Sequence, residues 1–345
     1  MKTKMQQFCG LTAKMLMIAG MFLSLSILSG CKKDSNSDNK EGYSNIKDDS
    51  TTRIITTIPR IALTKLKSPT KVNLYLSVTD QNGNAFKDFN QYNFTIKQVC
   101  VGSTDTTVVG GLSFGKLNTV GKRIITPLVL DYSGSMEDYA QNMQNAVANY
   151  ISLKEADDFI ELIKFSDYSQ VVQPFATDTA VLLNSLRRIW PGEWQMTAFY
   201  DAVGQGLIDA DSMVNHNFES YMPAVIAFTD GNDNQSYYYD NASVISKSLD
   251  TQIPIYTLGF GDVYTGTLQG IADQTGGRYY FAPNILDLKN LYARISGQLK
   301  NLYQVSWTFN NPSCSQVKII VEASYTCKNG TFKSTTVKSF VPFKK

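Results

Sequence analysis

The chain has 345 residues, of which 43% are hydrophobic and 18% charged, and its 32 basic and 30 acidic residues give a formal net charge of +2. Residues 1–30 carry three lysines and no acid, so a chain without them has a net charge of −1. This near-neutral balance offers no basic surplus for nucleic acid, which we exclude as the main partner. The length allows one large domain and a small one.

The first thirty residues have the pattern of an export signal. Three lysines accompany an uncharged, mostly apolar run over 15–29, which is shorter than the ~20 residues of a membrane-spanning helix. The run ends in Leu28, Ser29 and Gly30 before Cys31, and this ending resembles a lipobox. It predicts cleavage before Cys31 and a lipid anchor such as palmitate on its thiol, with an ordinary signal peptide and a chance cysteine as the alternative.

Residues 31–53 are polar and bury almost nothing, which predicts a solvated tether between the lipid and the folded part. Lys32, and not an aspartate, follows the cysteine, so the start does not resemble the inner-membrane retention signal of well-known Gram-negative systems. We therefore expect a cell-envelope protein anchored in the outer membrane, facing either the periplasm or the cell surface.

The folded part divides into three segments by pattern. Residues 54–118 alternate apolar and polar residues between turn signals, which predicts a β-rich accessory domain. Residues 119–301 alternate buried strands with helices, which indicates an α/β domain with a doubly wound, mostly parallel sheet. Residues 302–345 return to strands, and we expect them to complete a small flanking β-sandwich with the first segment.

Three cysteines remain after the leader and Cys31, namely Cys100, Cys314 and Cys327. Their spacing has no metal-ligand pattern, and an exported protein favours disulfides. We expect one disulfide and one free thiol, with Cys314 and Cys327 as the first choice of pair, although the sequence leaves the pairing open.

Oxygen-bearing side chains follow the predicted buried strands at the edge where such sheets bind ligands. Asp131, Ser133 and Ser135 stand at alternate positions directly after the strand that ends at Leu130, and Asp230 follows the strand over 224–228. Thr197 precedes a predicted helix between them. Carboxylate and hydroxyl oxygens at such positions suit a hard divalent cation such as Mg²⁺.

These five residues resemble the metal ion-dependent adhesion site of the von Willebrand factor type A family. The family's D-x-S-x-S motif is intact, and Thr197 and Asp230 match its other ligand positions in order and topology. The resemblance covers roughly 122–301 and is supported by the segments 256–261 and 271–277. It departs where Gln195 and Met196 precede the threonine, since family members often carry glycine there.

The resemblance implies a Rossmann-like fold that holds Mg²⁺, or Mn²⁺ or Ca²⁺, and binds a protein partner through an acidic residue. Two carboxylates balance the charge of the cation while the hydroxyls are neutral, so the metal stays electrophilic. We expect a binding module and no enzyme, because no nucleophile and general base accompany the site. The alternatives are a metal-assisted hydrolase and a structural envelope lipoprotein whose metal stabilises the fold.

Simpler interpretations compete for several residues. Helix capping explains one of Asp131, Ser133 and Ser135, but not all five positions. Asp233 and Asn234 are either turn formers or contacts at the rim of the site, and Trp194 either anchors a partner or packs over its loop.

Two motifs and the single histidine are rejected as sites. The glycine-rich stretch over 110–116 has Leu117 where a phosphate loop needs Ser or Thr. The stretch from Asp230 resembles an EF-hand start but has Gln235 in place of its glycine and Asn241 in place of its glutamate. His216 lies in a polar stretch, which leaves a Ser-His-Asp arrangement without support.

Overall fold

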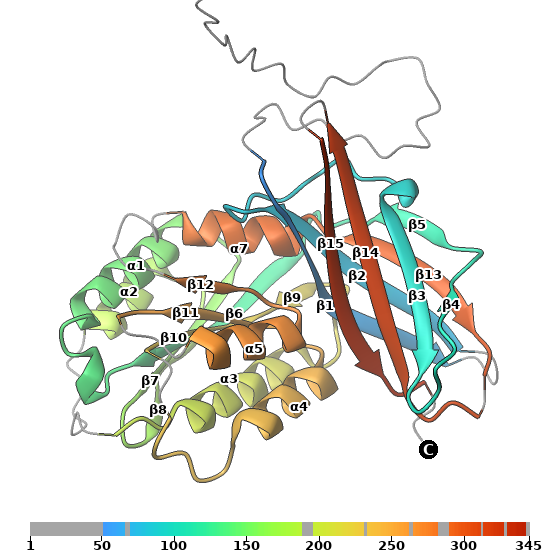
Figure 1. Ribbon diagram of the computed structural model, residues 1–345. Coiled ribbons are helices and arrows are strands. Elements are labelled where there is room, and N and C mark those ends of the chain that lie inside the picture. The colour runs from blue at the N-terminus through green and yellow to red at the C-terminus, as the bar shows by residue number, and fades with distance from the viewer. Residues whose placement is uncertain are drawn as a thin grey trace, which may run out of the picture.

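The computed structural model describes residues 51–65, 70–187, 196–230, 233–261, 265–281, 290–311, 313–327 and 330–342. The predicted leader, the proposed lipidation residue Cys31, almost all of the tether and Trp194 lie outside these residues. The described chain forms an α/β domain with a β-sandwich beside it (Figure 1). No helix among the described residues is long and apolar enough to cross a bilayer.

The large sheet of the α/β domain has the strand order β12-β11-β10-β6-β7-β8, and β9 pairs with β6 off this path. Its strands are β6 (Arg123–Asp131), β7 (Phe159–Phe165), β8 (Ser169–Ala176), β9 (Tyr221–Pro223), β10 (Val225–Thr229), β11 (Ile255–Gly259) and β12 (Tyr279–Phe281). All pairings are parallel except that of β8 with β7. The strand order reverses between β6 and β10, and ligands bind at such a switch point, beyond the carboxyl ends of the strands.

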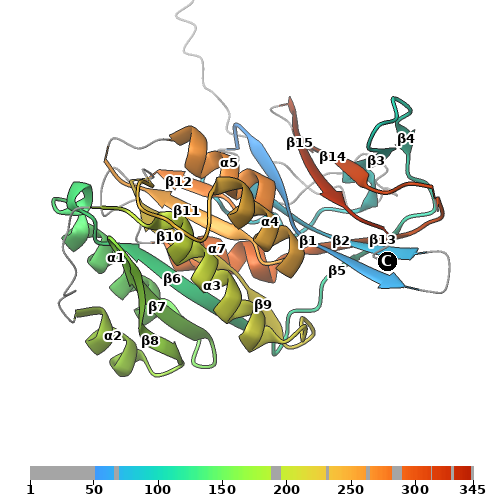
Figure 2. The same ribbon diagram turned by 90° about the horizontal axis from the view of Figure 1, so that it is seen from below.

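Helices cover both faces of this sheet (Figure 2). They are α1 (Ala140–Leu153), α2 (Thr179–Arg187), α3 (Phe199–Val214), α4 (Asn241–Thr251), α5 (Thr265–Thr275) and α7 (Leu291–Lys300). The first two and α7 share one hydrophobic core with the sheet, whereas α3, α4 and α5 share the other. Strand β6 serves both cores, with Leu128 and Leu130 in the first and Ile125 and Val129 in the second. A strand buried on both faces needs mostly apolar residues, which explains its long apolar run, broken only by Thr126.

The β-sandwich consists of two four-stranded sheets with the orders β1-β2-β13-β5 and β15-β14-β3-β4. Its strands are β1 (Ile54–Lys65), β2 (Thr70–Asp80), β3 (Phe94–Cys100), β4 (Thr107–Val108), β5 (Ser113–Lys116), β13 (Tyr303–Phe309), β14 (Val317–Cys327) and β15 (Gly330–Phe340). Strands from before and after the α/β domain pair within each sheet and share one core. The predicted fold class, a doubly wound, mostly parallel sheet with a flanking β-sandwich, is confirmed.

Two buried cations join the sandwich to the amino-terminal edge of the large sheet. Arg278, just before β12, donates to the hydroxyl of Thr79 at 2.6 Å and to the carbonyl oxygens of Asp80 and Gln81. Lys338 on β15 donates to carbonyl oxygens of β1 and to that of Thr275, the last residue of α5. The sandwich therefore holds the end of the domain opposite to the carboxyl ends of the parallel strands.

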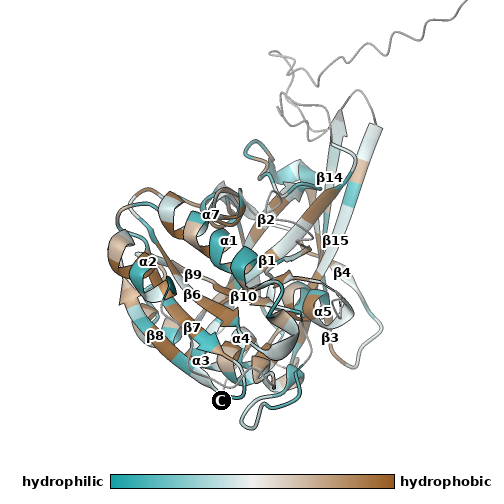
Figure 3. Cartoon of the chain, turned by 90° about the vertical axis from the view of Figure 1, so that its left-hand side faces the viewer, coloured by the Kyte–Doolittle hydropathy of each residue, from teal (hydrophilic) through white to brown (hydrophobic). Residues whose placement is uncertain are grey.

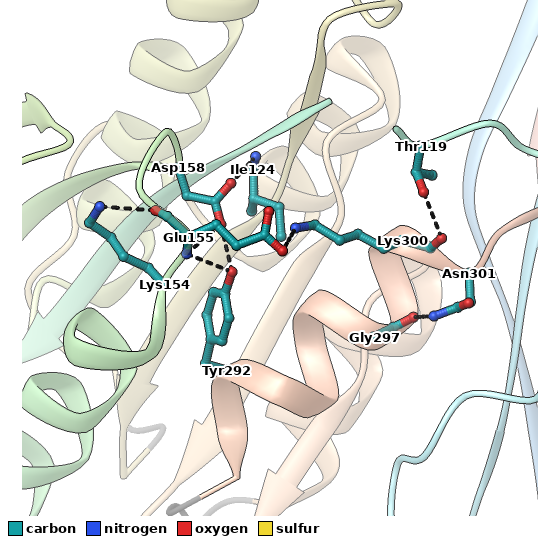
Figure 4. A network of polar contacts seen from close by, with 9 residues as sticks. All are labelled: Thr119, Ile124, Lys154, Glu155, Asp158, Tyr292, Gly297, Lys300 and Asn301. Atoms are coloured by element: carbon teal, nitrogen blue, oxygen red, sulfur yellow. Dashed lines mark hydrogen bonds and ion pairs between the residues drawn. The ribbon is translucent and has the colours of Figure 1, made fainter. Parts of the chain in front are cut away.

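Helix α7 is fastened to the same amino-terminal edge by polar contacts (Figure 4). The hydroxyl of Tyr292 donates to Asp158 Oδ2 at 2.6 Å, while Asp158 Oδ1 accepts from the backbone of Ile124 at 2.8 Å. Lys300 forms an ion pair with Glu155 in the same loop as Asp158. These bonds tie the last helix of the domain to the starts of β6 and β7.

The expected disulfide between Cys314 and Cys327 is wrong, because the structure bonds Cys314 to Cys100. Strand β14 pairs with β3 so that Val317 lies opposite Cys100, which brings the residues just before β14 to the end of β3. Cys327 lies at the far end of the 11-residue strand β14, and at ~3.3 Å per residue this is about 33 Å from its start. The pairing of β14 with β3 decides which cysteines meet, and the spacing of the cysteines along the sequence does not show which strands pair.

Candidate metal centre

Asp131 is the last residue of β6 and is fully buried beside the switch point of the sheet. Its Oδ1 accepts a hydrogen bond from the backbone N–H of Ser133 at 2.8 Å, and its Oδ2 accepts one from the hydroxyl of Thr229 at 2.6 Å. Burial raises the pKa of Asp131 to about 7, the bonds from Ser133 and Thr229 oppose this shift, and the nearby charge of Asp230 adds to it. The carboxylate of Asp131 is thus oriented by Thr229 on β10 and by the turn that follows β6.

Ser133 and Ser135 lie on the turn that leaves β6. The chain enters a short 3-10 helix over Gly134–Met136, and the two hydroxyl oxygens lie 3.4 Å apart. Ser133 is fully buried and Ser135 exposed. Ser133 occupies the N-cap position of this helix, yet its side chain makes no capping hydrogen bond. Capping therefore does not account for Ser133, whose side chain bonds to Asp131 and lies beside the hydroxyl of Ser135.

Thr197 is 3% exposed and is held from two sides. Its N–H donates to Oδ1 of Asn234 at 2.8 Å, and its carbonyl oxygen accepts from the N–H groups of Asn234 and Gln235. The next residue, Ala198, donates its N–H to the carbonyl of Ser166 at 2.7 Å. The threonine loop is therefore tied to the loops that follow β10 and β7, while Gln195 before it lies outside the described residues.

Asp230 follows β10 and is 8% exposed. Its Oδ1 is buried and has no hydrogen-bond partner within the described part of the chain. A buried carboxylate oxygen without a donor is costly, because desolvation is not repaid by any bond. A cation at this point would satisfy that oxygen, so the residues present fit a divalent metal.

The donor set consists of two carboxylates and three hydroxyls. In the described part of the chain no three side chains of His, Cys, Asp or Glu gather as a metal cluster. The five proposed ligands therefore carry only two charges and contain no thiolate or imidazole. Ligation by oxygen alone favours a hard cation over a softer one such as zinc. Contacts connect Asp131, Ser133 and Ser135 directly, and Thr197 and Asp230 belong to the two adjoining loops.

Sequence reasoning missed several residues that shape this site. Thr229 directly precedes Asp230 in the sequence. Its role in holding Asp131 arises only because β10 lies beside β6, which the sequence does not show. Lys164 is 1% exposed on β7, donates to the carbonyl of Leu186 at 2.8 Å and lies 4.8 Å from the ring centroid of Tyr132. Burial lowers the pKa of Lys164 to about 8. A lysine in an apolar strand carries no local signal of such a position.

The loop after β10 is organised by carboxylates. Asp233 Oδ2 accepts from the N–H of Tyr200 at 3.0 Å and from the hydroxyl of Ser236. Asn234 binds Thr197, as described above. Asp233 thus closes a turn through Ser236 and also connects the loop to α3, whereas Asn234 connects the loop to the threonine.

A doubly wound α/β domain with an oxygen-only ligand set at its switch point defines the class of this part of the molecule. Residues 127–294 match the model of the von Willebrand factor type A domain. The chain therefore contains a von Willebrand factor type A domain. No curated protein matches the sequence.

Solved structures of several proteins are similar in fold. The BatB protein of Bacteroides thetaiotaomicron is 17% identical with a TM-score of 0.44, over 52% of this chain and all of that chain. A von Willebrand factor type A protein of Catenulispora acidiphila is 12% identical with a TM-score of 0.43, over 84% and 72%. The manganese-loaded TRAP protein of Plasmodium vivax is 14% identical with a TM-score of 0.41, over 66% and 96%.

Proposed function

We propose that the α/β domain binds a divalent cation through Asp131, Ser133, Ser135, Thr197 and Asp230 and uses it to bind a protein partner. The observation that carries this proposal is the partnerless, buried Oδ1 of Asp230 beside the oriented carboxylate of Asp131. A bound cation would supply an electrophilic position for a carboxylate of the partner. Mg²⁺ is the expected ion, with Mn²⁺ and Ca²⁺ as alternatives.

The binding function is preferred over catalysis because the described surroundings of the site offer no nucleophile and base as a pair. The hydrogen-bonded residues around the site position the proposed ligands: Thr229 orients Asp131, and Asn234 holds the loop that carries Thr197. The partner is a protein with an acidic residue, and the chain reaches it from a lipid anchor at Cys31 in the outer membrane. The accessory sandwich lies at the opposite end of the domain from the proposed metal, so it leaves the binding face open to a partner.

Calorimetric titration of the folded part with Mg²⁺, Mn²⁺ and Ca²⁺ tests the metal. Ser133→Ala combined with Ser135→Ala is expected to abolish the binding heat, because two of the five ligands are lost. Ser152→Ala is the matched control, since its exposed hydroxyl only donates to a carbonyl within α1. A wild-type protein that takes up none of the three ions would refute the metal site.

Cross-linking in cells, read by mass spectrometry, tests the partner. Proteins captured by the wild type and lost with the double serine variant are the expected result. A hydrolase screen with Mg²⁺ or Mn²⁺ tests the alternative of a metal-assisted hydrolase. Turnover by the wild type that disappears in Asp131→Ala would show that the protein is an enzyme. If EDTA lowers the melting temperature but changes no captured protein, the metal only stabilises the fold.

A further inference from the structure

Two neighbouring tyrosines stand out on the loop that follows Asp230. Tyr237 is 85% exposed and Tyr238 81% exposed, and their rings contact each other edge to face with centroids 5.1 Å apart. Exposing two aromatic rings side by side gives the fold little stability, because nothing is removed from water. Aromatic side chains of this kind are enriched where a protein contacts a partner.

The backbone beneath these rings is held firmly. Asp201 on α3 accepts hydrogen bonds from the N–H groups of Tyr237, Tyr238 and Tyr239 at 2.8–2.9 Å. The ring of Tyr239 packs on α3 so closely that a Cβ on Gly204 would lie 2.5 Å from it. One tyrosine therefore anchors the loop and the other two are presented to solvent, so little backbone entropy is lost when a partner binds.

The same bonds connect the tyrosines to the proposed metal ligands. Asp201 lies in the first turn of α3, four residues after Thr197, and Asn234, three residues before Tyr237, binds both backbone groups of that threonine. The exposed pair is thus fixed relative to the metal centre by α3 and by the loop itself.

The described loop segments at this end of the domain carry negative charge, which favours a positively charged partner. The described parts of the loops at the carboxyl ends of the strands, 132–139, 166–168, 196–198 and 233–240, contain five carboxylates besides the proposed ligands and neither lysine nor arginine. They are Glu137, Asp138, Asp167, Asp233 and Asp240. Figure 3 views the molecule from the side of the α/β domain and shows the largely apolar strands of its sheet among the helices. An acidic partner surface would be repelled here, apart from the one carboxylate that binds the metal.

We propose that Tyr237 and Tyr238 are the specificity contact of the metal-dependent site and bind a lysine or arginine that flanks the partner's metal-binding carboxylate. Cations stack on the faces of exposed aromatic rings, and the surrounding carboxylates attract them over a longer range. The partner segment is therefore basic around a single acid. This inference rests on the proposed function, because the metal must first engage the acid.

Synthetic peptide arrays test the proposal. Each peptide carries one central aspartate, flanked by lysine and arginine, by leucine, by alanine or by glutamate, and is probed with the folded protein in Mg²⁺ and in EDTA. Peptides with basic flanks are expected to bind best in Mg²⁺ and to lose binding in EDTA. Tyr237→Ala with Tyr238→Ala should weaken these peptides by roughly 5- to 30-fold. Tyr92→Ala, which removes a tyrosine that is 51% exposed in the sandwich, should not.

The outcomes separate this inference from the proposed function. Mg²⁺ titration of the tyrosine variant should give the wild-type affinity, because no ligand is changed. Equal Mg²⁺-dependent binding of all flanks, or unchanged binding by the tyrosine variant, would overturn the aromatic contact and leave the metal-dependent function standing. Binding that EDTA does not affect would overturn both.

Discussion

The hydroxyl of Thr229 donates a 2.6 Å hydrogen bond to Oδ2 of Asp131, so the end of β10 orients the carboxylate at the end of β6. Both residues are fully buried, and the bond crosses the point where the strand order reverses. A carboxylate binds a metal only when it points at it, and hydrogen bonds from residues that do not touch the metal fix that orientation. The threonine is therefore part of the site although it is not a proposed ligand.

Thr229→Val is expected to weaken Mg²⁺ binding by about tenfold, because Asp131 loses the donor that holds Oδ2. Calorimetric titration measures the effect. Thr257→Val is the control, since its buried hydroxyl on β11 donates to the carbonyl of Leu268 on α5 and not to a proposed ligand. If both variants keep the wild-type affinity, Thr229 does not position the ligand.

Glu161→Gln is expected to stabilise the protein at alkaline pH. Glu161 is 3% exposed, its Oε2 has no hydrogen-bond partner among the described residues, and burial together with Asp209 raises its pKa from 4.5 to about 8. A carboxyl group with a raised pKa in the folded state binds more protons there than in the unfolded state. Its contribution to stability is present at low pH and is lost as the pH rises from about 4.5 to about 8.

Urea unfolding at pH 5 and pH 8 measures this prediction. The variant should lose less stability between the two values than the wild type and should gain roughly 1–3 kcal/mol relative to it at pH 8. Glu322→Gln is the control, because that carboxylate is half-exposed in an ion pair with Lys97. Parallel pH profiles of wild type and Glu161→Gln would contradict the assignment.

Lys338→Met is expected to lower the free energy of unfolding by about 2–4 kcal/mol, because three carbonyl oxygens at the junction lose their donor. The buried ammonium donates to Ile58, Pro59 and Thr275 at 2.9, 3.3 and 3.0 Å. Lys333→Met changes an exposed lysine on the same strand and should cost little. Equal denaturation midpoints for the two variants would show that Lys338 does not hold the domains together.

Mass spectrometry of peptides from unreduced protein should recover Cys100 linked to Cys314, and Cys327 in no disulfide with either. Cys100→Ser and Cys314→Ser should each destabilise the protein by about 2–4 kcal/mol, since either removes a cross-link between segments 214 residues apart. Cys327→Ser should leave that cross-link and its contribution intact. A peptide joining Cys314 to Cys327 would restore the pairing that the structure rejects.

Much of the fold could be predicted because its signals are local. The long, mostly apolar run before Asp131 indicated a strand buried on both faces, and alternation with helices indicated a doubly wound sheet. Element boundaries have weaker local signals: α1 begins only at Ala140, because the chain first forms a 3-10 helix over Gly134–Met136. The three-residue strand β9 was missed, since it is too short to show a period.

The sequence by itself determined which residues bear oxygen at the strand ends, because Asp131, Ser133 and Ser135 lie within one turn and Asp230 follows a later apolar strand. Only the tertiary structure decided how these groups are held: the bond from Thr229, the clamp of Asp201 on the tyrosine loop and the pairing of Cys100 with Cys314. The physical reason is range. Side-chain type and backbone periodicity act over a few residues, whereas hydrogen-bond partners and burial depend on which distant strands become neighbours.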